Sequence, residues 1–122
     1  MKLHIKYILL CLGVMLSCQS TPEVSEEGAK EKLNVILDDW HDAAAKADFE
    51  RYFQHMKAEA IFMGTDATEY WIKKEFKKFA KPYFDRGRAW DFIPVSRNIY
   101  LSKNHQAAWF DEQLDTPNLG PA

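Results

Sequence analysis

The sequence predicts an α+β fold in which helices in the N-terminal part of the domain precede antiparallel strands. Between residues 27 and 85, apolar residues recur mainly at three- and four-residue steps, which is typical of amphipathic helices. From residue 89 onward, apolar and polar residues alternate over two stretches separated by a short polar segment, which is typical of a β-hairpin. A chain of this length supports one modest core.

The first residues, 1–17, indicate an export signal that precedes the fold. Two lysines give a basic start, and residues 7–16 form a nearly unbroken apolar run that ends at Ser17. Ten residues make about 15 Å of helix, which is too short for a hydrocarbon core of about 30 Å. A basic start, a short apolar run and a small residue before the cleavage point form the secretory pattern. Cys18 directly follows Ser17 and resembles the lipidated cysteine of bacterial lipoproteins.

We therefore expect residues 1–17 to be a signal peptide, residues 18–27 a lipidated cysteine with a flexible tether, and residues 28–122 the domain. The protein would be exported and held at the bacterial cell envelope as a membrane-anchored lipoprotein. The alternatives are an ordinary signal peptide with a secreted or periplasmic product, or a short N-terminal anchor. Cys11 lies in the apolar run and is the only cysteine besides Cys18, so no disulfide is expected.

The charge of the chain argues against nucleic acid as a partner. The formal net charge is −2, and loss of two lysines with the signal would make it −4. Nucleic-acid binding requires a basic footprint, which this balance does not provide.

Two helices are expected at the start of the domain. Residues 27–47 place apolar side chains on one stripe, and the aromatic residues between Phe49 and Met56 indicate a second, shorter helix. Residues 60–63 predict a short strand. The apolar stripe of the first helix consists of Leu33, Ile36, Leu37, Trp40, Ala44 and Ala47.

A third helix is expected over residues 72–85, with five lysines on its exposed face. The preceding Asp66-Ala-Thr-Glu69 has the form of a capping box, in which two side chains accept from backbone N–H groups three residues away. The helix is expected to end at Arg86-Gly87. The side chains that this helix is expected to bury are Ile72, Phe76, Phe79 and Tyr83.

Two alternating strands are predicted over residues 89–101 and 107–114, with Lys103-Asn-His-Gln106 as the turn. In the first strand, Arg97 falls in an apolar row, where it needs a carboxylate partner to remain buried.

The register of this hairpin decides which carboxylate Arg97 meets. A turn centred on Asn104 places Asp111 opposite Arg97, and a one-residue slip places Glu112 there instead. The pair is either a polar spot in a pocket, able to orient a ligand's carboxylate or carbonyl, or a structural ion pair. A third alternative is that Arg97 extends from the sheet edge to place its charge in solvent.

Two motifs resemble a known family. The string Gly64-Thr-Asp-Ala-Thr-Glu-Tyr-Trp71, between a short strand and a basic helix, and the later Ala89-Trp-Asp-Phe92 resemble the SnoaL-like branch of the nuclear transport factor 2-like superfamily. The resemblance covers residues 30–121. It implies a cystatin-like α+β cone, in which N-terminal helices pack on a curved antiparallel sheet around a pocket. It also implies further strands after Leu114, so we expect the final strands to be missing here.

The resemblance implies that the cone binds a small, partly apolar molecule. We expect Arg97 and Asp111 to orient this ligand and three tryptophans, Trp40, Trp71 and Trp109, to pack against it. The alternative for the tryptophans is a role in the core alone. No metal-ligand spacing and no nucleotide-binding motif is present in the sequence, so no metal and no cofactor is expected.

An enzyme of the isomerase or dehydratase type is the runner-up interpretation. The candidate proton acceptors are Asp66 and Asp111, and His41 is a further catalytic candidate. The alternatives are that Asp66 only caps a helix and that His41 is a partly buried structural histidine. A third interpretation is a homodimer through an outer sheet face formed by Trp90, Phe92 and Tyr100.

Overall fold

The computed structural model describes residues 24–64 and 66–117, so the predicted signal peptide, Cys18 and most of the tether lie outside the described residues. Within these ranges, three helices and four strands follow one another. They are α1 (Glu26–Ala45), α2 (Phe49–Gln54), β1 (Ile61–Met63), β2 (Tyr70–Ile72), α3 (Lys73–Asp85), β3 (Ile93–Leu101) and β4 (Ala108–Asp115).

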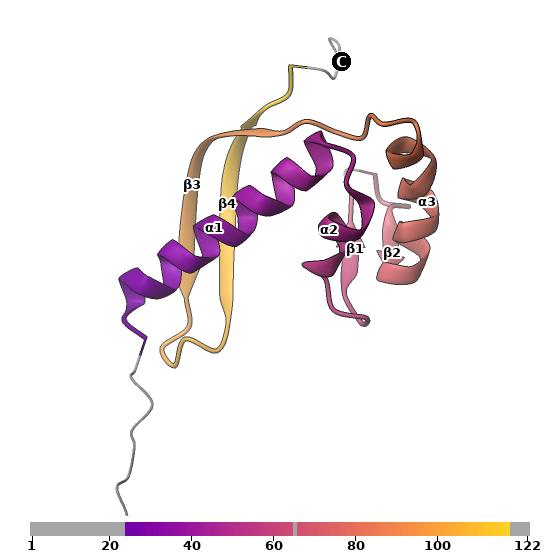
Figure 1. Cartoon of the computed structure of the whole chain (residues 1–122). Helices are drawn as coiled ribbons and strands as arrows, with labels where there is room; N and C mark the ends of the chain where they lie inside the picture. Colours follow the sequence, from indigo (N-terminus) through magenta and orange to yellow (C-terminus); the bar gives the residue numbers. More distant parts are fainter. Residues whose placement is uncertain (1–23, 65, 118–122) are drawn as a thin grey trace, which may run out of the picture.

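The described strands form two antiparallel hairpins, β1–β2 and β3–β4, where one curved sheet was expected. Helix α1 lies across the β3–β4 hairpin, whereas α2, α3 and the β1–β2 hairpin gather beside the C-terminal end of α1 (Figure 1). The segment after α3 passes this end of α1 and leads into β3. The fold class is α+β, as predicted.

The first two helices begin where polar side chains accept from free backbone N–H groups. The Gly28 N–H donates to Ser25 Oγ at 3.1 Å before α1, and the Arg51 N–H donates to Asp48 Oδ1 at 3.2 Å before α2. Between the two helices, Ala47 has a left-handed backbone with φ of 52°. The expected bounds of both helices agree with the structure to within about two residues, which is the usual uncertainty of helix ends.

The main core lies between α2, α3 and the end of α1. Phe53 and Phe76 are almost fully buried, and Phe76 is followed at four-residue steps by Ala80 and Phe84. The prediction of the buried face of α3 is therefore partly wrong: Phe79 and Tyr83 were expected to be buried, but they lie outside the buried row and are partly exposed. The complete buried cluster is Ala43, Ala44, Tyr52, Phe53, Phe76, Ala80 and Phe84.

The predicted capping box is only partly present, because the segment forms the turn of the β1–β2 hairpin: Glu69 accepts from the Asp66 N–H, but the Asp66 side chain accepts from Thr68 and not from the Glu69 N–H. The backbone N–H and the hydroxyl of Thr68 donate to Asp66 Oδ1 at 2.8 and 2.6 Å, and the Glu69 N–H donates to the Asp66 carbonyl at 2.9 Å. Helix α3 begins after Ile72, which makes no side-chain cap. Strand β2, which this turn introduces, is absent from the sequence-based expectation.

The β3–β4 hairpin adopts the slipped register. Arg97 pairs with Glu112, whereas Asp111 pairs with Asn98 and accepts from its side-chain amide at 2.8 Å. The reason is the turn: the Ser102 N–H donates to the Ala107 carbonyl at 2.9 Å, which leaves four residues between them and centres the turn after Asn104.

A bulge interrupts β3 between Pro94 and Ser96. The extra residue reverses which side chains face α1, so Val95 and Ile93 are exposed although they share the sequence alternation of Arg97. The strand begins at Ile93, and Ala89–Phe92 precedes it as an irregular segment.

Candidate functional site

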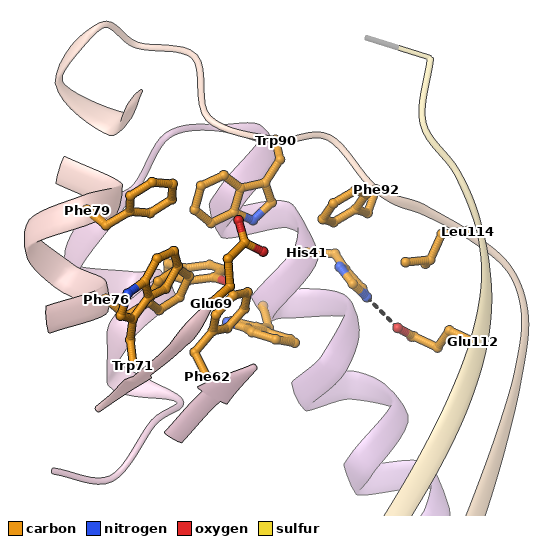
Figure 2. A pocket seen from close by; sticks show the side chains of 12 residues that line it. His41, Phe62, Glu69, Trp71, Phe76, Phe79, Trp90, Phe92, Glu112 and Leu114 are labelled. Atoms are coloured by element: carbon orange, nitrogen blue, oxygen red, sulfur yellow. Dashed lines mark hydrogen bonds and ion pairs between the residues drawn. The ribbon is translucent and has the colours of Figure 1, made fainter. Parts of the chain in front are cut away.

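A cavity of about 370 Å³ lies between the β1–β2 hairpin with α3 on one side and α1 with β4 on the other (Figure 2). Aromatic side chains form most of its wall, and the remaining lining residues are Leu114 and three polar residues, His41, Glu69 and Glu112. The aromatic lining residues are Trp40, Tyr52, Phe62, Trp71, Phe76, Phe79, Trp90 and Phe92.

Stacked rings form the wall of the cavity on the β1–β2 side. Phe62 and Trp71 are opposite each other in that hairpin, and the Phe62 ring lies 3.8 Å from the Phe76 ring, centroid to centroid. Trp71 stacks on Phe79 at 4.5 Å. Because each ring supports the next, this wall is a preformed apolar surface.

Tyr52 and Trp90 close the cavity toward the core. Their rings make an edge contact at 5.5 Å, and Trp90 makes a second edge contact with Phe84 at 5.3 Å. Burial raises the pKa of the Tyr52 phenol, and a hydrogen bond with the Trp90 indole opposes this rise.

The polar edge of the cavity is a hydrogen-bonded chain of three side chains. His41 Nε2 lies 2.9 Å from Glu112 Oε2, and Arg97 Nε donates to Glu112 Oε1 at 2.6 Å. The side chains of His41, Glu112 and Arg97 are 9%, 6% and 7% exposed. Because both Glu112 oxygens are occupied, its charge is neutralised where it is buried.

Arg97 lies behind Glu112 and does not line the cavity. Its Nη1 donates to the carbonyl and the side-chain oxygen of Asn34 at 3.2 and 3.0 Å. Its Nη2 lies 2.9 Å from Asp38 Oδ1, which is an ion-pair distance without the alignment of a hydrogen bond. Arg97 thus ties β3 to α1 and fixes the orientation of Glu112.

Glu69 reaches the cavity from the opposite side, and its carboxylate points toward Trp90 (Figure 2). Gly64 makes room for it, because a Cβ atom at Gly64 would lie 1.9 Å from Glu69 Oε2. The same oxygen accepts a long hydrogen bond, 3.4 Å, from the Asp66 N–H. A glycine at this position is therefore needed for the observed placement of Glu69.

Among the residues named from the sequence, Trp40, Trp71 and His41 line the cavity. Asp66 does not, because it lies in the exposed hairpin turn. There the Thr68 hydroxyl and backbone N–H hold the pKa of Asp66 below its ordinary value, whereas a general base benefits from a raised one.

The register of β3–β4 moves two other candidates away from the cavity. Asp111 lies on the outer face of the hairpin, and so does Trp109, which is 56% exposed and stacks on Tyr100 at 5.9 Å. The three residues named for a homodimer surface do not share one face, because Trp90 and Phe92 line the cavity whereas Tyr100 is exposed on the outer face of β3.

The sequence reasoning did not assign Glu69 and Glu112 to the pocket, although it noted both. Glu112 was the partner in the slipped register, and a turn length of four residues was the signal that favours that register. Glu69 was interpreted as part of a cap. The signal for its placement is the glycine five residues earlier, directly after an apolar strand.

Two general features complete the description of residues 24–64 and 66–117. No group of three or more His, Cys, Asp or Glu side chains in these ranges is arranged to hold a metal ion. No helix there is both long and apolar enough to cross a membrane.

A comparison with protein families gives one match. A family model described as a SnoaL-like domain matches residues 33–121, which include every described residue that lines the cavity. Neither the curated proteins nor the solved structures gave a significant match.

Proposed function

Because the chain belongs to the SnoaL-like family, whose α+β fold is that of the nuclear transport factor 2-like superfamily, we propose that its cavity binds a small, mainly apolar molecule that contains a ring. The observation that supports this proposal is the composition of the cavity wall. Eight aromatic side chains surround a volume of about 370 Å³, and polar groups are confined to two opposite edges. Ligand pockets of about 300–1,000 Å³ with few, localised polar groups are typical binding sites for small molecules.

The two edges have different parts in this proposal. A flat ring would lie against the stacked wall of Phe62 and Trp71, where contact area is largest. A polar substituent of the ligand would meet the edge formed by His41 and Glu112. Arg97 would hold this edge in place from behind without touching the ligand.

A titration with 2-naphthol, a flat fluorescent ring compound with one hydroxyl group, tests the binding proposal on the full chain. Leu114→Trp places a larger side chain at the cavity wall and should weaken binding about tenfold, which is about 1.4 kcal/mol. Val95→Trp adds the same side chain at the exposed bulge and should leave the affinity unchanged. Equal effects of the two substitutions, or no binding to the unsubstituted protein, would contradict the proposal.

Proton transfer to or from the bound molecule is a second candidate function, favoured by the contact between His41 and Glu112. A carboxylate that orients an imidazole inside an apolar cavity is a common arrangement for general acid–base catalysis. The test is deuterium exchange at the acidic C–H groups of 2-tetralone in D₂O, followed by NMR. His41→Gln should abolish any exchange above background. An exchange rate that His41→Gln leaves unchanged would remove His41 from this role.

We also propose that the protein is exported and anchored through lipid on Cys18. The support is the sequence of residues 1–18 alone: a basic start, a short apolar run and Ser17-Cys18. Mass spectrometry of the mature N-terminus from a bacterial host tests it. A lipid-modified Cys18 is the expected result, and Cys18→Ser should release the protein from the membrane fraction. An unmodified N-terminus at another residue would contradict lipidation.

A further inference from the structure

We propose that the ligand of the cavity is an organic cation, a positively charged nitrogen attached to an apolar or ring-containing body. This inference rests on the proposed binding function and specifies the chemical class of the ligand. It follows from three features of the cavity that point to the same charge: an unpaired carboxylate, the absence of lysine and arginine from the described wall, and the many aromatic faces.

Glu69 supplies the unpaired carboxylate. Among residues 24–64 and 66–117, no lysine, arginine or histidine forms an ion pair with it, and its hydrogen bond from the Asp66 N–H is long, 3.4 Å. Its carboxylate lines the aromatic cavity and points toward Trp90, although its hydrogen bond from the Asp66 N–H is exposed (Figure 2). A half-buried carboxylate beside apolar rings favours a positive partner, because opposite charges attract more strongly near a protein surface than in bulk water.

Glu112, the other carboxylate of the wall, does not compete for this role. Arg97 and His41 occupy both of its oxygens at 2.6 and 2.9 Å. The two edges of the cavity therefore differ in kind. One is an internally neutralised pair, and the other, at Glu69, carries a negative charge without a counter-ion in the described residues.

The aromatic wall favours the same charge. The faces of tryptophan, tyrosine and phenylalanine rings attract cations within about 6 Å of the ring centre, and such rings are the common recognition device for quaternary ammonium groups. Glu69 points toward the ring of Trp90, so an ammonium group beside the carboxylate would also contact an aromatic face (Figure 2). The described lining contains no lysine or arginine that would repel it.

The test compares two probes of nearly equal shape, benzyltrimethylammonium and its uncharged carbon analogue neopentylbenzene, with the full chain. Binding is followed by tryptophan fluorescence. The variants are Glu69→Gln, which keeps the shape of the side chain and removes its charge, and Glu31→Gln as a matched control. Glu31 is an exposed residue of α1, ten residues and thus about 15 Å along the helix from His41.

The expected result is that benzyltrimethylammonium binds more tightly than neopentylbenzene. Glu69→Gln should weaken the cation about tenfold and leave the neutral probe unchanged, and Glu31→Gln should change neither. The preference should also fall as sodium chloride is added, because the interaction is partly exposed. Near-UV circular dichroism of each variant verifies that the fold is retained.

Three outcomes would overturn the inference, and they differ in what they say of the proposed function. If both probes bind equally, the cavity binds ligands but does not select a cation. If the preference survives in Glu69→Gln, Glu69 is not the group that selects the cation, although the cavity still binds ligands. If neither these probes nor 2-naphthol binds, both the cation and the binding function are excluded.

Discussion

Glu112 and His41 meet at 2.9 Å inside the domain although 71 positions separate them in the chain. The contact joins β4 to α1 at the edge of the cavity. Arg97 on the neighbouring strand contacts the other oxygen of Glu112, so one buried carboxylate connects three elements. The stability of the domain and the shape of the cavity therefore depend on the same group of side chains.

The first prediction concerns this buried pair. Arg97→Leu should lower the free energy of unfolding by about 3–5 kcal/mol, because Glu112 would remain buried without its main counter-charge. The double variant Arg97→Leu with Glu112→Leu should recover much of the loss, since apolar replacement of a whole buried pair is often close to neutral. Urea unfolding followed by tryptophan fluorescence measures both.

A surface pair provides the comparison for this experiment. Lys46 and Asp42 form an exposed ion pair one helical turn apart, and Lys46→Ala should change stability by about 0.3–0.5 kcal/mol. If Arg97→Leu lowers the free energy of unfolding by no more than Lys46→Ala does, the buried pair does not stabilise the domain as described.

The second prediction uses the close approach of Gly64 to Glu69. Gly64→Ala should displace the Glu69 side chain, because the added Cβ atom would lie 1.9 Å from Oε2, and should lower stability by about 1–3 kcal/mol. It should also weaken the binding of benzyltrimethylammonium. The matched control is Gly87→Ala, where φ is +71° and no heavy atom lies within 4 Å.

The control separates backbone strain from the effect on the cavity. Gly87→Ala should lower stability by about 1–2 kcal/mol through its left-handed conformation and leave the probe affinity unchanged. Equal affinities of the Gly64→Ala and unsubstituted proteins would show that the placement of Glu69 does not matter for binding.

The third prediction concerns stability in acid. Hydrogen bonds from Arg51, and then from His55, hold the pKa of Asp39 below its ordinary value of 3.8. The contribution of ionised Asp39 to stability is therefore fully present above pH 3.8 and is lost as the pH falls through the lower pKa of the folded state. Asp39→Asn should be less stable at neutral pH and should lose less stability on acidification.

Urea unfolding at several pH values between about 2 and 7 tests this expectation. Glu59→Gln also replaces a carboxylate by an amide, at an exposed position, and is the control. Its free energy of unfolding should depend on pH in the same way as that of the unsubstituted protein. If the free energy of unfolding of Asp39→Asn also falls with pH in the same way as that of the unsubstituted protein, Asp39 does not contribute to the loss of stability in acid.

The fourth prediction concerns Tyr52 in alkali. Burial raises its pKa above the ordinary 10.0, so its contribution to stability is complete below about pH 10 and is lost as the pH rises toward the folded-state pKa. In a titration of phenolate absorbance, Tyr52→Phe should remove the last-titrating group. Tyr70→Phe, at an exposed position, is the control and should leave the last-titrating group in place. A last-titrating group that persists in Tyr52→Phe would contradict the burial of the Tyr52 phenol.

The helices were predictable because their signals are local. The apolar stripe and the residues Ser25 and Asp48 at the helix starts act within a few positions of the chain. Strand β2 was not predictable in the same way. Its three residues precede a helix directly, and only pairing with β1 distinguishes them from a helical start.

The site was only partly predictable because it depends on pairing between distant segments. The need of Arg97 for a carboxylate follows from its apolar neighbours, but the choice between Asp111 and Glu112 depends on one residue of register. The placement of Glu69 depends on a contact with Gly64 that exists only after the hairpin has closed.

Because of the bulge at Val95, the shape of the cavity depends on the number of residues in β3 as well as on which residues they are. Because one extra residue separates Pro94 from Ser96 relative to the partner strand, the chain before the bulge faces the opposite way from an uninterrupted strand. Deleting Val95 would keep every cavity side chain in the sequence, yet it would reverse the faces of Ile93 and Pro94 and change how the segment with Trp90 and Phe92 enters the strand. A relative with all the lining residues but one residue fewer in this strand would therefore have a different pocket.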